Sequence, residues 1–461
     1  MKNQLSYLPA VLLMLMSMNV FAQDWPQFLG PERNSTSPQK NLLREWPETG
    51  PEVLWTVPLG IGYGGPVVKD GKVYILDRND EEGDKMRCFD LNTGDELWNF
   101  EYAAAGSVMF PGSRSVPIVD DKHVYSCGPF GDLYCIDLES HKPVWNVNVW
   151  TEFGGDVGNP PSHESEGGAG GFAPRGNFPI WAISQNPLIY DDLLVLASQA
   201  PDAGVVAYNK NTGNLVWKTP NLGNENYASP TVIEIHGEDH IVMVISSTNP
   251  IGRRDTPKTP GSIVGIDPAN GKILWKFEGW ECHITVPSAV DVGNNKILAT
   301  GGYERGATMI QVEKQSDGSY AAKELFTTVE FGDQTKPPLL IDGNFYAQYG
   351  TNNRRDGLTC MNMNGEIMWK TKRDPDFNKG SMIYADGLIL ATDGARKLYL
   401  IEPDISGFKP IASSELLAEQ KGEGMVARFG TQNWAPIALA DGKLLIRDQS
   451  RMLCVQVAES Y

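Results

Sequence analysis

Short runs of alternating apolar and polar residues recur along this chain of 461 residues, and turns rich in Gly, Asp and Asn separate them. Each unit has the same order: an apolar run opened by proline, a turn such as Asp-Gly, a second run, a hairpin, a third run ending in Asp or Asn, and a fourth run. Alternation with period two between such turns is typical of antiparallel strands. The pattern therefore predicts a series of small antiparallel sheets.

The number of units sets the architecture. Proline opens seven units, which fits the first residue of a strand because no ladder hydrogen bond is needed there, and an eighth unit begins near Ser381 without one. The opening prolines are Pro66, Pro117, Pro187, Pro230, Pro287, Pro337 and Pro436. Eight four-stranded units predict an all-β fold, an eight-bladed β-propeller of antiparallel blades.

The two ends of the repeat region complement each other. The last unit stops at 452–457 without a fourth strand, whereas residues 53–57 (VLWTV) look like a fourth strand without its first three. We expect this N-terminal strand to complete the last blade. The ring would then close without an unpaired edge, and unpaired edges promote aggregation.

One phrase returns in most units. Residues 88–98 read CFDLNTGDELW, and their pattern Asp/Asn-x-x-Thr-Gly-x-x-x-Trp resembles the tryptophan-docking motif of PQQ-type quinoprotein propellers. The tryptophans that match are Trp55, Trp98, Trp145, Trp217, Trp275 and Trp369. The resemblance runs from about Val53 to the end and implies that each ring packs between neighbouring blades. Phe326 is expected to substitute in the fifth blade, and the seventh copy is degenerate.

The chain divides into three parts by composition. Residues 1–22, with Lys2, an apolar run and Val-Phe-Ala before Gln23, predict a signal peptide and hence an exported, periplasmic or secreted protein. Residues 23–52 form a leader and 53–461 a single propeller with an insert at 150–181. Because Gln rather than Cys follows the expected cleavage site, we expect no lipid anchor. No later run is long enough to predict a membrane span.

The charge of the chain limits its possible partners, and its cysteines bear on whether it contains disulfides. The formal charge is −18, and loss of Lys2 would make it −19, which disfavours nucleic acid and anionic membranes. Equivalent positions of the repeat hold Cys, Ala or Gly, which favours small buried residues over disulfides. A bridge between Cys127 and Cys135 across a hairpin stays an open alternative.

Residues just before the strand-opening positions converge on the axial mouth of a propeller. These residues differ in chemistry from blade to blade, whereas the rest of the repeat is nearly the same in each blade. A ligand site at the mouth is therefore the default hypothesis. The site residues that we select from this ring are Tyr63, Arg114, Glu225, Tyr227, His283, Asp333, Lys336, Lys379, Asn433 and Trp434. The insert adds His163 as part of a lid, although a solvated loop is an equal alternative.

The favoured hypothesis is β-elimination by a lyase or dehydratase acting on a uronate-containing, acidic oligosaccharide. Cations in so acidic a protein suit an anionic ligand, and proton abstraction beside a carboxylate requires its neutralisation and a positioned base. Arg114 and Lys336 would clamp the carboxylate, with Lys379 as a further cation. His283 or His163 would be the base. The acid and the stacking roles fall to the aromatic residues, with Tyr227 or Tyr63 as acid and Trp434 stacking on a sugar ring. This hypothesis needs no metal and no cofactor.

Two alternatives remain open. The resemblance to quinoproteins implies a dehydrogenase that holds PQQ with calcium at the mouth, and Glu225, Asn433 and Asp333 would be its ligands and base. The adjacent Cys-Cys pair that covers PQQ in many alcohol dehydrogenases is absent, and the chain is short for that class. The other alternative is a non-catalytic propeller that binds a ligand or a protein. The sequence leaves the oligomeric state unknown.

Overall fold

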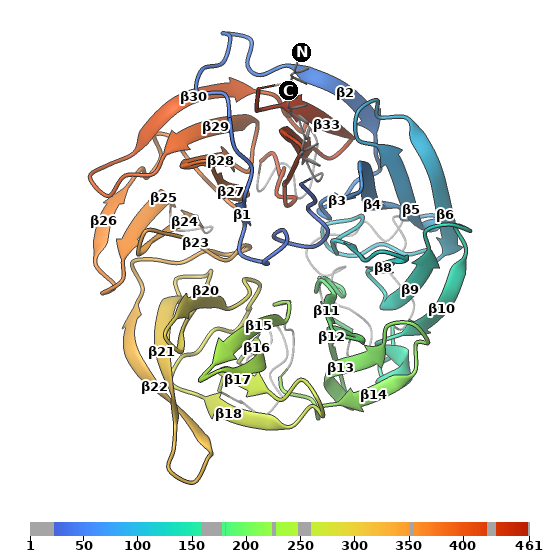
Figure 1. Ribbon diagram of the computed structural model, residues 1–461, viewed down its shortest axis with the longest axis vertical. Helices are drawn as coiled ribbons and strands as arrows, with labels where there is room; N and C mark the ends of the chain where they lie inside the picture. Colours follow the sequence, from blue (N-terminus) through green and yellow to red (C-terminus); the bar gives the residue numbers. More distant parts are fainter. Residues whose placement is uncertain are drawn as a thin grey trace, which may run out of the picture.

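The computed structural model describes residues 23–157, 178–179, 181–223, 227–247, 260–350, 355–421 and 430–459. Within these residues, eight sheets lie around a central axis, and each contains four antiparallel strands (Figure 1). The first strand of a blade lies nearest the axis and the last lies at the rim. The expected all-β, eight-bladed propeller is therefore confirmed.

Blades 1 to 4 take their strands in chain order. Blade 1 contains β3 (Val67–Lys69), β4 (Lys72–Asn79), β5 (Gly83–Asp90) and β6 (Glu96–Ala103). Blade 2 contains β7 (Ile118–Val119), β8 (His123–Cys127), β9 (Asp132–Asp137) and β10 (Pro143–Asn148), followed by the short 3-10 helix η1 (Thr151–Phe153). Blade 3 contains β11 (Leu188–Tyr190), β12 (Leu193–Ala200), β13 (Ala203–Asn209) and β14 (Leu215–Lys218). Blade 4 contains β15 (Thr231–Ile235), β16 (Glu238–Ile245), β17 (Ser262–Ile266) and β18 (Ile273–Phe277).

Blades 5 to 8 continue the series, and the last one borrows a strand. Blade 5 contains β19 (Val290–Gly293), β20 (Lys296–Gly301), β21 (Gly306–Lys314) and β22 (Tyr320–Thr328). Blade 6 contains β23 (Leu339–Ile341), β24 (Asn344–Gly350), β25 (Arg355–Asn362) and β26 (Ile367–Lys370). Blade 7 contains β27 (Met382–Ala385), β28 (Leu388–Thr392), β29 (Lys397–Glu402) and β30 (Lys409–Glu415). Blade 8 contains β31 (Ala438–Ala440), β32 (Lys443–Arg447), β33 (Arg451–Gln456) and β2 (Val53–Pro58).

The ring closes between the two ends of the repeat region. Strand β2 pairs antiparallel with β33 and places Trp55 opposite Cys454. It thus takes the outer position of blade 8, as expected from the sequence. The leader adds a feature that we did not expect, because β1 (Thr36–Ser37) pairs parallel with β27 and extends blade 7 to five strands.

The repeated phrase joins neighbouring blades. The indole N–H of Trp217 donates to the carbonyl of Pro268 at 2.8 Å, and the ring lies against Gly271 in the same turn of the next blade. Equivalent pairs are Trp55 with Gly94 and Trp145 with Gly213. In the fifth blade the ring that lies against the glycine of the next turn is Phe326, which confirms the expected substitution. The docking motif is therefore a packing device between blades.

The cysteines take part in the apolar packing. All six are buried and free. The β8–β9 register places Cys127 opposite Leu133 and Cys135 opposite Tyr125, so the two thiols do not meet and the alternative of a bridge between them is not realised. Among the described residues, no helix has the length and apolar character that crossing a bilayer requires.

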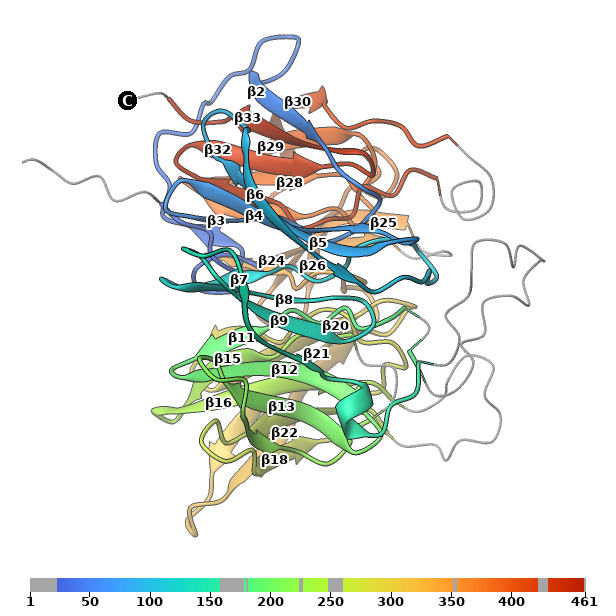
Figure 2. The same cartoon turned by 90° about the vertical axis from the view of Figure 1, so that its right-hand side faces the viewer.

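The leader crosses the axis of the ring (Figure 1). Trp25 and Val68 exchange two backbone hydrogen bonds of 2.9 Å, and the amide of Val119 donates to the carbonyl of Pro26. Further along, the amide of Tyr384 donates to the carbonyl of Ser35. Seen edge-on in Figure 2, the blue leader runs along one face of the ring. It therefore joins the innermost strands of blades 1, 2 and 7.

Candidate functional site

A cavity of about 320 Å³ lies at the axial mouth, between the segments that enter the innermost strands. Six of the residues selected from the sequence line it, and they come from six different blades or blade connections. These residues are Tyr63, Arg114, Tyr227, Lys336, Lys379 and Trp434. The repeat architecture brings them together because every blade delivers one segment to the axis.

The cavity holds buried positive charge. Lys336 and Lys379 are 8% and 5% exposed. The ammonium group of Lys336 donates to the carbonyl of Trp434 at 2.7 Å, and that of Lys379 lies 4.7 Å from the centre of the Trp434 ring. Among the described residues, neither ammonium group forms an ion pair. Buried charges without partners are costly, so the cavity is suited to a ligand that brings negative charge.

Burial alters the acidity of these cations. It lowers the pKa of Lys336 to about 8, although the nearby carboxylate of Asp333 opposes the shift. Burial and the charge of Arg355 lower the pKa of Lys379 to about 8. The pKa of Arg114 falls to about 10, again through burial, so its guanidinium stays charged at neutral pH. The charge of the two lysines is thus adjustable near physiological pH, and that of Arg114 is not.

Aromatic rings form the walls in two groups. In the first group, the rings of Tyr63 and Phe110 each lie 5.7 Å from a ring of Trp434, and they lie 6.1 Å from each other. In the second group, Trp181 lies 5.2 Å from Tyr227 and stacks with Tyr303 at 6.5 Å. Such faces favour planar ligands and, because of their quadrupoles, cations as well.

Two of the expected site residues lie behind the wall. One oxygen of Asp333 accepts hydrogen bonds from the amides of Thr335 (2.9 Å) and Lys336 (3.0 Å), and the other accepts from the amide of Gln348 (3.1 Å). Burial raises the pKa of Asp333 to about 6, in spite of these donors. The side-chain amide of Asn433 donates to the carbonyls of Ala395 and Ala418. Both groups shape the loops at the mouth and do not line the cavity.

The expected acids and bases differ in position, and the two tyrosines, Tyr63 and Tyr227, line the cavity. His283 lies outside the lining, with its ring 5.3 Å from that of Tyr303, and burial together with Arg305 lowers its pKa. The hydroxyl of Tyr63 donates to Gln432 at 2.8 Å, and burial raises its pKa to about 12 against the opposing charge of Arg114. His163 and Glu225 lie outside the described residues.

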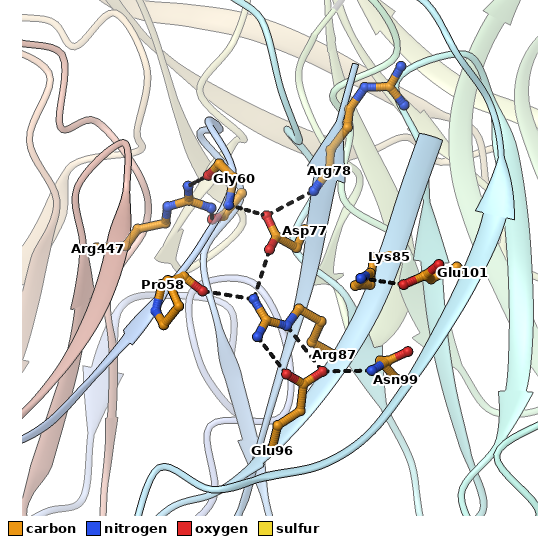
Figure 3. Close-up of polar contacts among 11 residues, drawn as sticks. Pro58, Gly60, Asp77, Arg78, Lys85, Arg87, Glu96, Asn99, Glu101 and Arg447 are labelled. Atoms are coloured by element: carbon orange, nitrogen blue, oxygen red, sulfur yellow. Dashed lines mark hydrogen bonds and ion pairs between the residues drawn. The ribbon is translucent and has the colours of Figure 1, made fainter. Parts of the chain in front are cut away.

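A network of buried charges holds the segment that carries Tyr63 (Figure 3). The Arg447 guanidinium donates to the carbonyl of Gly60 at 2.7 Å, and one Asp77 oxygen accepts from the amide of Gly60 at 2.9 Å. The other oxygen of Asp77 accepts from Arg87 at 3.1 Å. Blades 1 and 8 therefore fix the backbone just before Tyr63 from two sides.

Arg78 holds the start of the connection that leads to Phe110 and Arg114. Its fully buried guanidinium pairs with Asp80 at 2.7 Å and with Asp84 at 2.9 Å, and it donates to the carbonyls of residues 104 and 106. Arg114 in turn donates to the carbonyls of Met109 and Phe110. The ring of Phe110 and the charge of Arg114 thus depend on one local hydrogen-bonded unit.

The leader supplies the floor of the cavity. Phe28 is 7% exposed and lines the cavity. The buried guanidinium of Arg33 donates to the carbonyls of Pro187 at 3.0 Å and Pro230 at 3.1 Å. These two residues precede the innermost strands of blades 3 and 4. The leader therefore lies across the axial channel, and we call the cavity that it helps to line the axial cup.

Comparison with known proteins places this fold in a family. The family model described as outer membrane protein assembly factor BamB matches residues 82–371. The chain belongs to this family. A quinoprotein ethanol dehydrogenase of Pseudomonas aeruginosa is 23% identical over 192 residues, or 41% of this chain. The match spans 26% of that dehydrogenase, about a quarter of its length.

Solved structures share the architecture. BamB from Moraxella catarrhalis superposes with a TM-score of 0.54 at 12% identity, over 88% of this chain and 99% of that one. A europium-containing methanol dehydrogenase gives 0.61 at 12% identity, over 92% and 89%. The quinohemoprotein alcohol dehydrogenase of Comamonas testosteroni gives 0.59 at 11%, over 95% and 81%. These likenesses show the fold and confirm the resemblance to PQQ-type propellers.

The lining can be compared with the two groups that the quinoprotein alternative requires, PQQ and calcium. Three cations and two groups of aromatic rings suit a planar polycarboxylate such as PQQ. Calcium requires oxygen ligands, above all carboxylates. Among the described residues, no carboxylate lines the cavity, and no group of three His, Cys, Asp or Glu side chains lies close enough to hold a metal. The described residues therefore do not fit the metal.

Sequence reasoning selected Tyr63, Tyr227 and Trp434 but missed the other rings of the aromatic walls and the floor. Phe110, Trp181 and Tyr303 stand apart from the strand-opening positions, in connections and hairpins whose approach to the axis has no signature in the repeat. Phe28 belongs to a leader whose path across the ring depends on tertiary contacts. Asp333, by contrast, has a local signal, because Asp commonly accepts hydrogen bonds from the amides two and three residues ahead. That signal favours a turn-forming role.

Proposed function

We propose that this chain binds a planar, carboxylated ligand in the axial cup, and that PQQ is the first candidate. The observation that carries the proposal is the pair of buried lysines, Lys336 and Lys379, which face an aromatic cavity without ion-pair partners among the described residues. A ligand carboxylate would compensate this charge, and a flat ring system would use the aromatic walls. The names of the dehydrogenase relatives, quinoprotein and quinohemoprotein, direct attention to a quinone.

The cations and the aromatic rings of the cavity would bind different parts of such a ligand. Lys336, Lys379 and Arg114 would neutralise the carboxylates, and the rings of Trp434 and Trp181 would offer faces for stacking. The leader closes the far end, so the ligand would enter and leave through the mouth. When bound, PQQ supplies two-electron oxidation chemistry. Because the described residues do not fit calcium, we propose ligand binding for this chain and do not extend the proposal to alcohol oxidation.

Elimination on a uronate stays a prediction without support from the relatives, whose names point to the two alternatives instead. The same three cations could neutralise a uronate carboxylate. However, His283, the described candidate base, lies outside the cavity lining. The name of the family model, an outer-membrane assembly factor, agrees with a binding propeller and with the expected export. The exported location and an acidic oligosaccharide partner likewise remain proposals.

Isothermal titration calorimetry tests the proposal directly. PQQ and an unsulfated uronate trisaccharide would each be titrated into the full chain without metal, and again with calcium chloride. We expect PQQ to bind without calcium, and Lys336→Met to raise its Kd at least tenfold, because a hydrogen bond to a charged group contributes about 1.5–3 kcal/mol. Lys421→Met is the matched control, since that side chain is 85% exposed and should leave the Kd unchanged.

The outcomes separate the candidate functions. Absence of PQQ binding to a chain with an intact circular dichroism spectrum would contradict the proposal. Reduction of a dye by alcohols after addition of PQQ and calcium would extend it to a dehydrogenase. Binding of the trisaccharide in place of PQQ, with a new absorbance of unsaturated uronate, would replace it by elimination.

A further inference from the structure

Like Phe110 and Tyr303, which also line the cavity, Lys379 has a left-handed backbone conformation. Its φ of 64° lies in the left-handed region, where a residue with a side chain costs about 1–2 kcal/mol. Five of the other non-glycine residues in this region are aspartates of the hairpin turns, which tolerate it: Asp70, Asp191, Asp342, Asp386 and Asp441. Lys379 is instead a mouth residue, three positions before β27. Strained residues of this kind concentrate at functional sites.

The side chain of Lys379 is also in an unusual environment. It is 5% exposed, lines the cavity and contacts the face of Trp434, 4.7 Å from the ring centre. Among the described residues, no acceptor takes a hydrogen bond from its amine. Lys336 differs, because its ammonium group donates to the carbonyl of the same tryptophan and this bond favours the charged form. The pKa values do not separate the two amines, since both are lowered to about 8, but among the described residues only that of Lys379 lacks such an acceptor.

The charges around Lys379 add to this effect. Burial and Arg355 lower its pKa to about 8, while Asp333 and Asp376 oppose the shift. Roughly a tenth of the side chains would be neutral amines at pH 7 and about half at pH 8. A desolvated lysine near another cation is a known form of activated nucleophile. Strain, burial and an unpaired amine thus coincide on one residue of the cavity.

We propose that Lys379 is the nucleophilic amine of the cavity and forms an imine with a planar aldehyde or ketone that carries a carboxylate or phosphate. The inference rests on the proposed binding of planar anions and adds a covalent step to it. The lone pair of the neutral Nζ forms a C–N bond with the carbonyl carbon, the C=O π pair moves to oxygen, and one proton passes from the nitrogen to that oxygen. The hydroxyl then leaves with the second proton of the nitrogen as water, which leaves the C=N bond, and no oxidant or reductant takes part.

The other groups of the cavity hold such a ligand in place. Arg114 and Lys336 are the remaining cations and would bind its acid group. The rings of Trp434 and Trp181 would stack on its plane, which keeps the carbonyl within reach of the amine. The ligand class is therefore an acidic aromatic or conjugated carbonyl compound. An aliphatic amine has the wrong charge and no carbonyl carbon, and a neutral sugar lacks both the negative charge and the planar ring.

Pyridoxal 5′-phosphate is a suitable probe, since it is a planar aldehyde with a phosphate. The full chain would be incubated with one equivalent between pH 6 and 10, reduced with sodium borohydride and mapped by mass spectrometry. We expect one adduct, on Lys379, formed at least tenfold faster at pH 8 than any on the exposed Lys421, with a rate midpoint near pH 8. An ordinary lysine would give a midpoint near ~10.4. Lys379→Arg should abolish the adduct, and Lys421→Arg should leave it unchanged.

A second ligand separates the failure of this inference from that of the proposed function. Pyridoxine 5′-phosphate has the same ring and phosphate but an alcohol in place of the aldehyde, so it cannot form an imine. If it binds in calorimetry while Lys379 remains unlabelled by the aldehyde, or while Lys336 is labelled instead, the nucleophilic role is wrong and anion binding stands. If neither pyridoxine 5′-phosphate nor PQQ binds, the proposed function fails as well.

Discussion

At the scale of single residues, two buried lysines decide how the cavity responds to pH. The pKa of Lys336 and that of Lys379 are both lowered to about 8, chiefly by burial. Between pH 7 and pH 9 each lysine passes from mostly charged to mostly neutral. An anion that needs the charged form should lose up to about tenfold in affinity per lysine over this interval.

The corresponding measurement is the Kd of PQQ between pH 6 and pH 9. We expect little change below pH 7 and a rise of up to about 100-fold by pH 9. Lys336→Arg should keep one charge over the whole range and reduce the rise to about tenfold. A Kd that is independent of pH would show that these lysines do not bind the anion.

The same shifts have a consequence for stability, and its sign is opposite to the usual one for paired lysines. Because the folded pKa lies below the ordinary lysine value of 10.5, the unfolded chain holds more protons between about pH 8 and 10.5. The contribution of Lys336 and Lys379 to stability therefore rises with pH in this window. This contribution is unfavourable below pH 8, because the folded protein then holds two buried charges that a bound anion would compensate.

Whether a cavity residue could be predicted from the sequence depends on where it lies in the repeat. Arg114, Lys336 and Trp434 could be selected from the sequence because a propeller sends the residues before each innermost strand to its axis. Side-chain direction could not be inferred, which is why Asn433, a member of the same ring, bonds to loop carbonyls behind the wall. Phe110 lines the cavity from the same segment as Arg114, whose guanidinium donates to the carbonyl of Phe110.

At the scale of the element, the turn between the third and fourth strands joins one blade to the next. Gly271 has φ 73° and lies so close to Trp217 that an added Cβ would be 2.6 Å from the ring. Glycine is thus required twice here, for conformation and for space. Gly237, in the β15–β16 hairpin, has φ 79° and nothing within 4 Å of such a Cβ, so it requires glycine only for conformation.

This pair of glycines allows the packing contribution of the docking motif to be measured. We expect Gly237→Ala to cost about 1–2 kcal/mol, from the left-handed backbone alone. Gly271→Ala should cost about 1–3 kcal/mol more, because the Trp217 ring must move. Urea denaturation monitored by fluorescence would give both values. Equal costs would mean that the ring adapts freely and that the motif contributes little to blade contacts.

The elements themselves were predictable because local chemistry specifies them. Prolines, Asp-Gly turns and period-two alternation mark nearly every strand. The repeated tryptophan and glycine, such as Trp217 and Gly271, mark the contact between neighbouring blades. Strand β1 was not predictable, since Thr36 and Ser37 have no strand pattern and pair only because the leader passes beside β27.

At the scale of the whole molecule, the ring depends on one non-covalent closure. In blades 1 to 7 the fourth strand is linked to the third by a short turn, whereas β2 meets β33 from the other end of the chain. The leader adds a second constraint, because Arg33 links blades 3 and 4 through two buried carbonyls. Closure was predictable from the complementary ends of the repeat, but the axial path of the leader was not.

Two tryptophans can test whether closure is the weak point of the ring. Trp55 and Trp217 are 8% and 7% exposed, and their indole N–H groups donate to Leu91 at 2.9 Å and Pro268 at 2.8 Å. Replacing either by alanine should cost about 3–5 kcal/mol. The two variants should differ in their tendency to associate, because β14 remains tethered to β13 whereas β2 can leave the ring.

Departure of β2 would uncover the edge of β33, whose residues 452–455 are all buried and apolar. Such an edge pairs readily with another chain. Trp55→Ala should therefore form oligomers in size-exclusion chromatography with light scattering at temperatures well below its unfolding midpoint, while Trp217→Ala stays monomeric until it unfolds. If both variants remain monomeric with the same loss of stability, β2 is held as firmly as a covalently linked strand, and the eight blades respond as one cooperative unit.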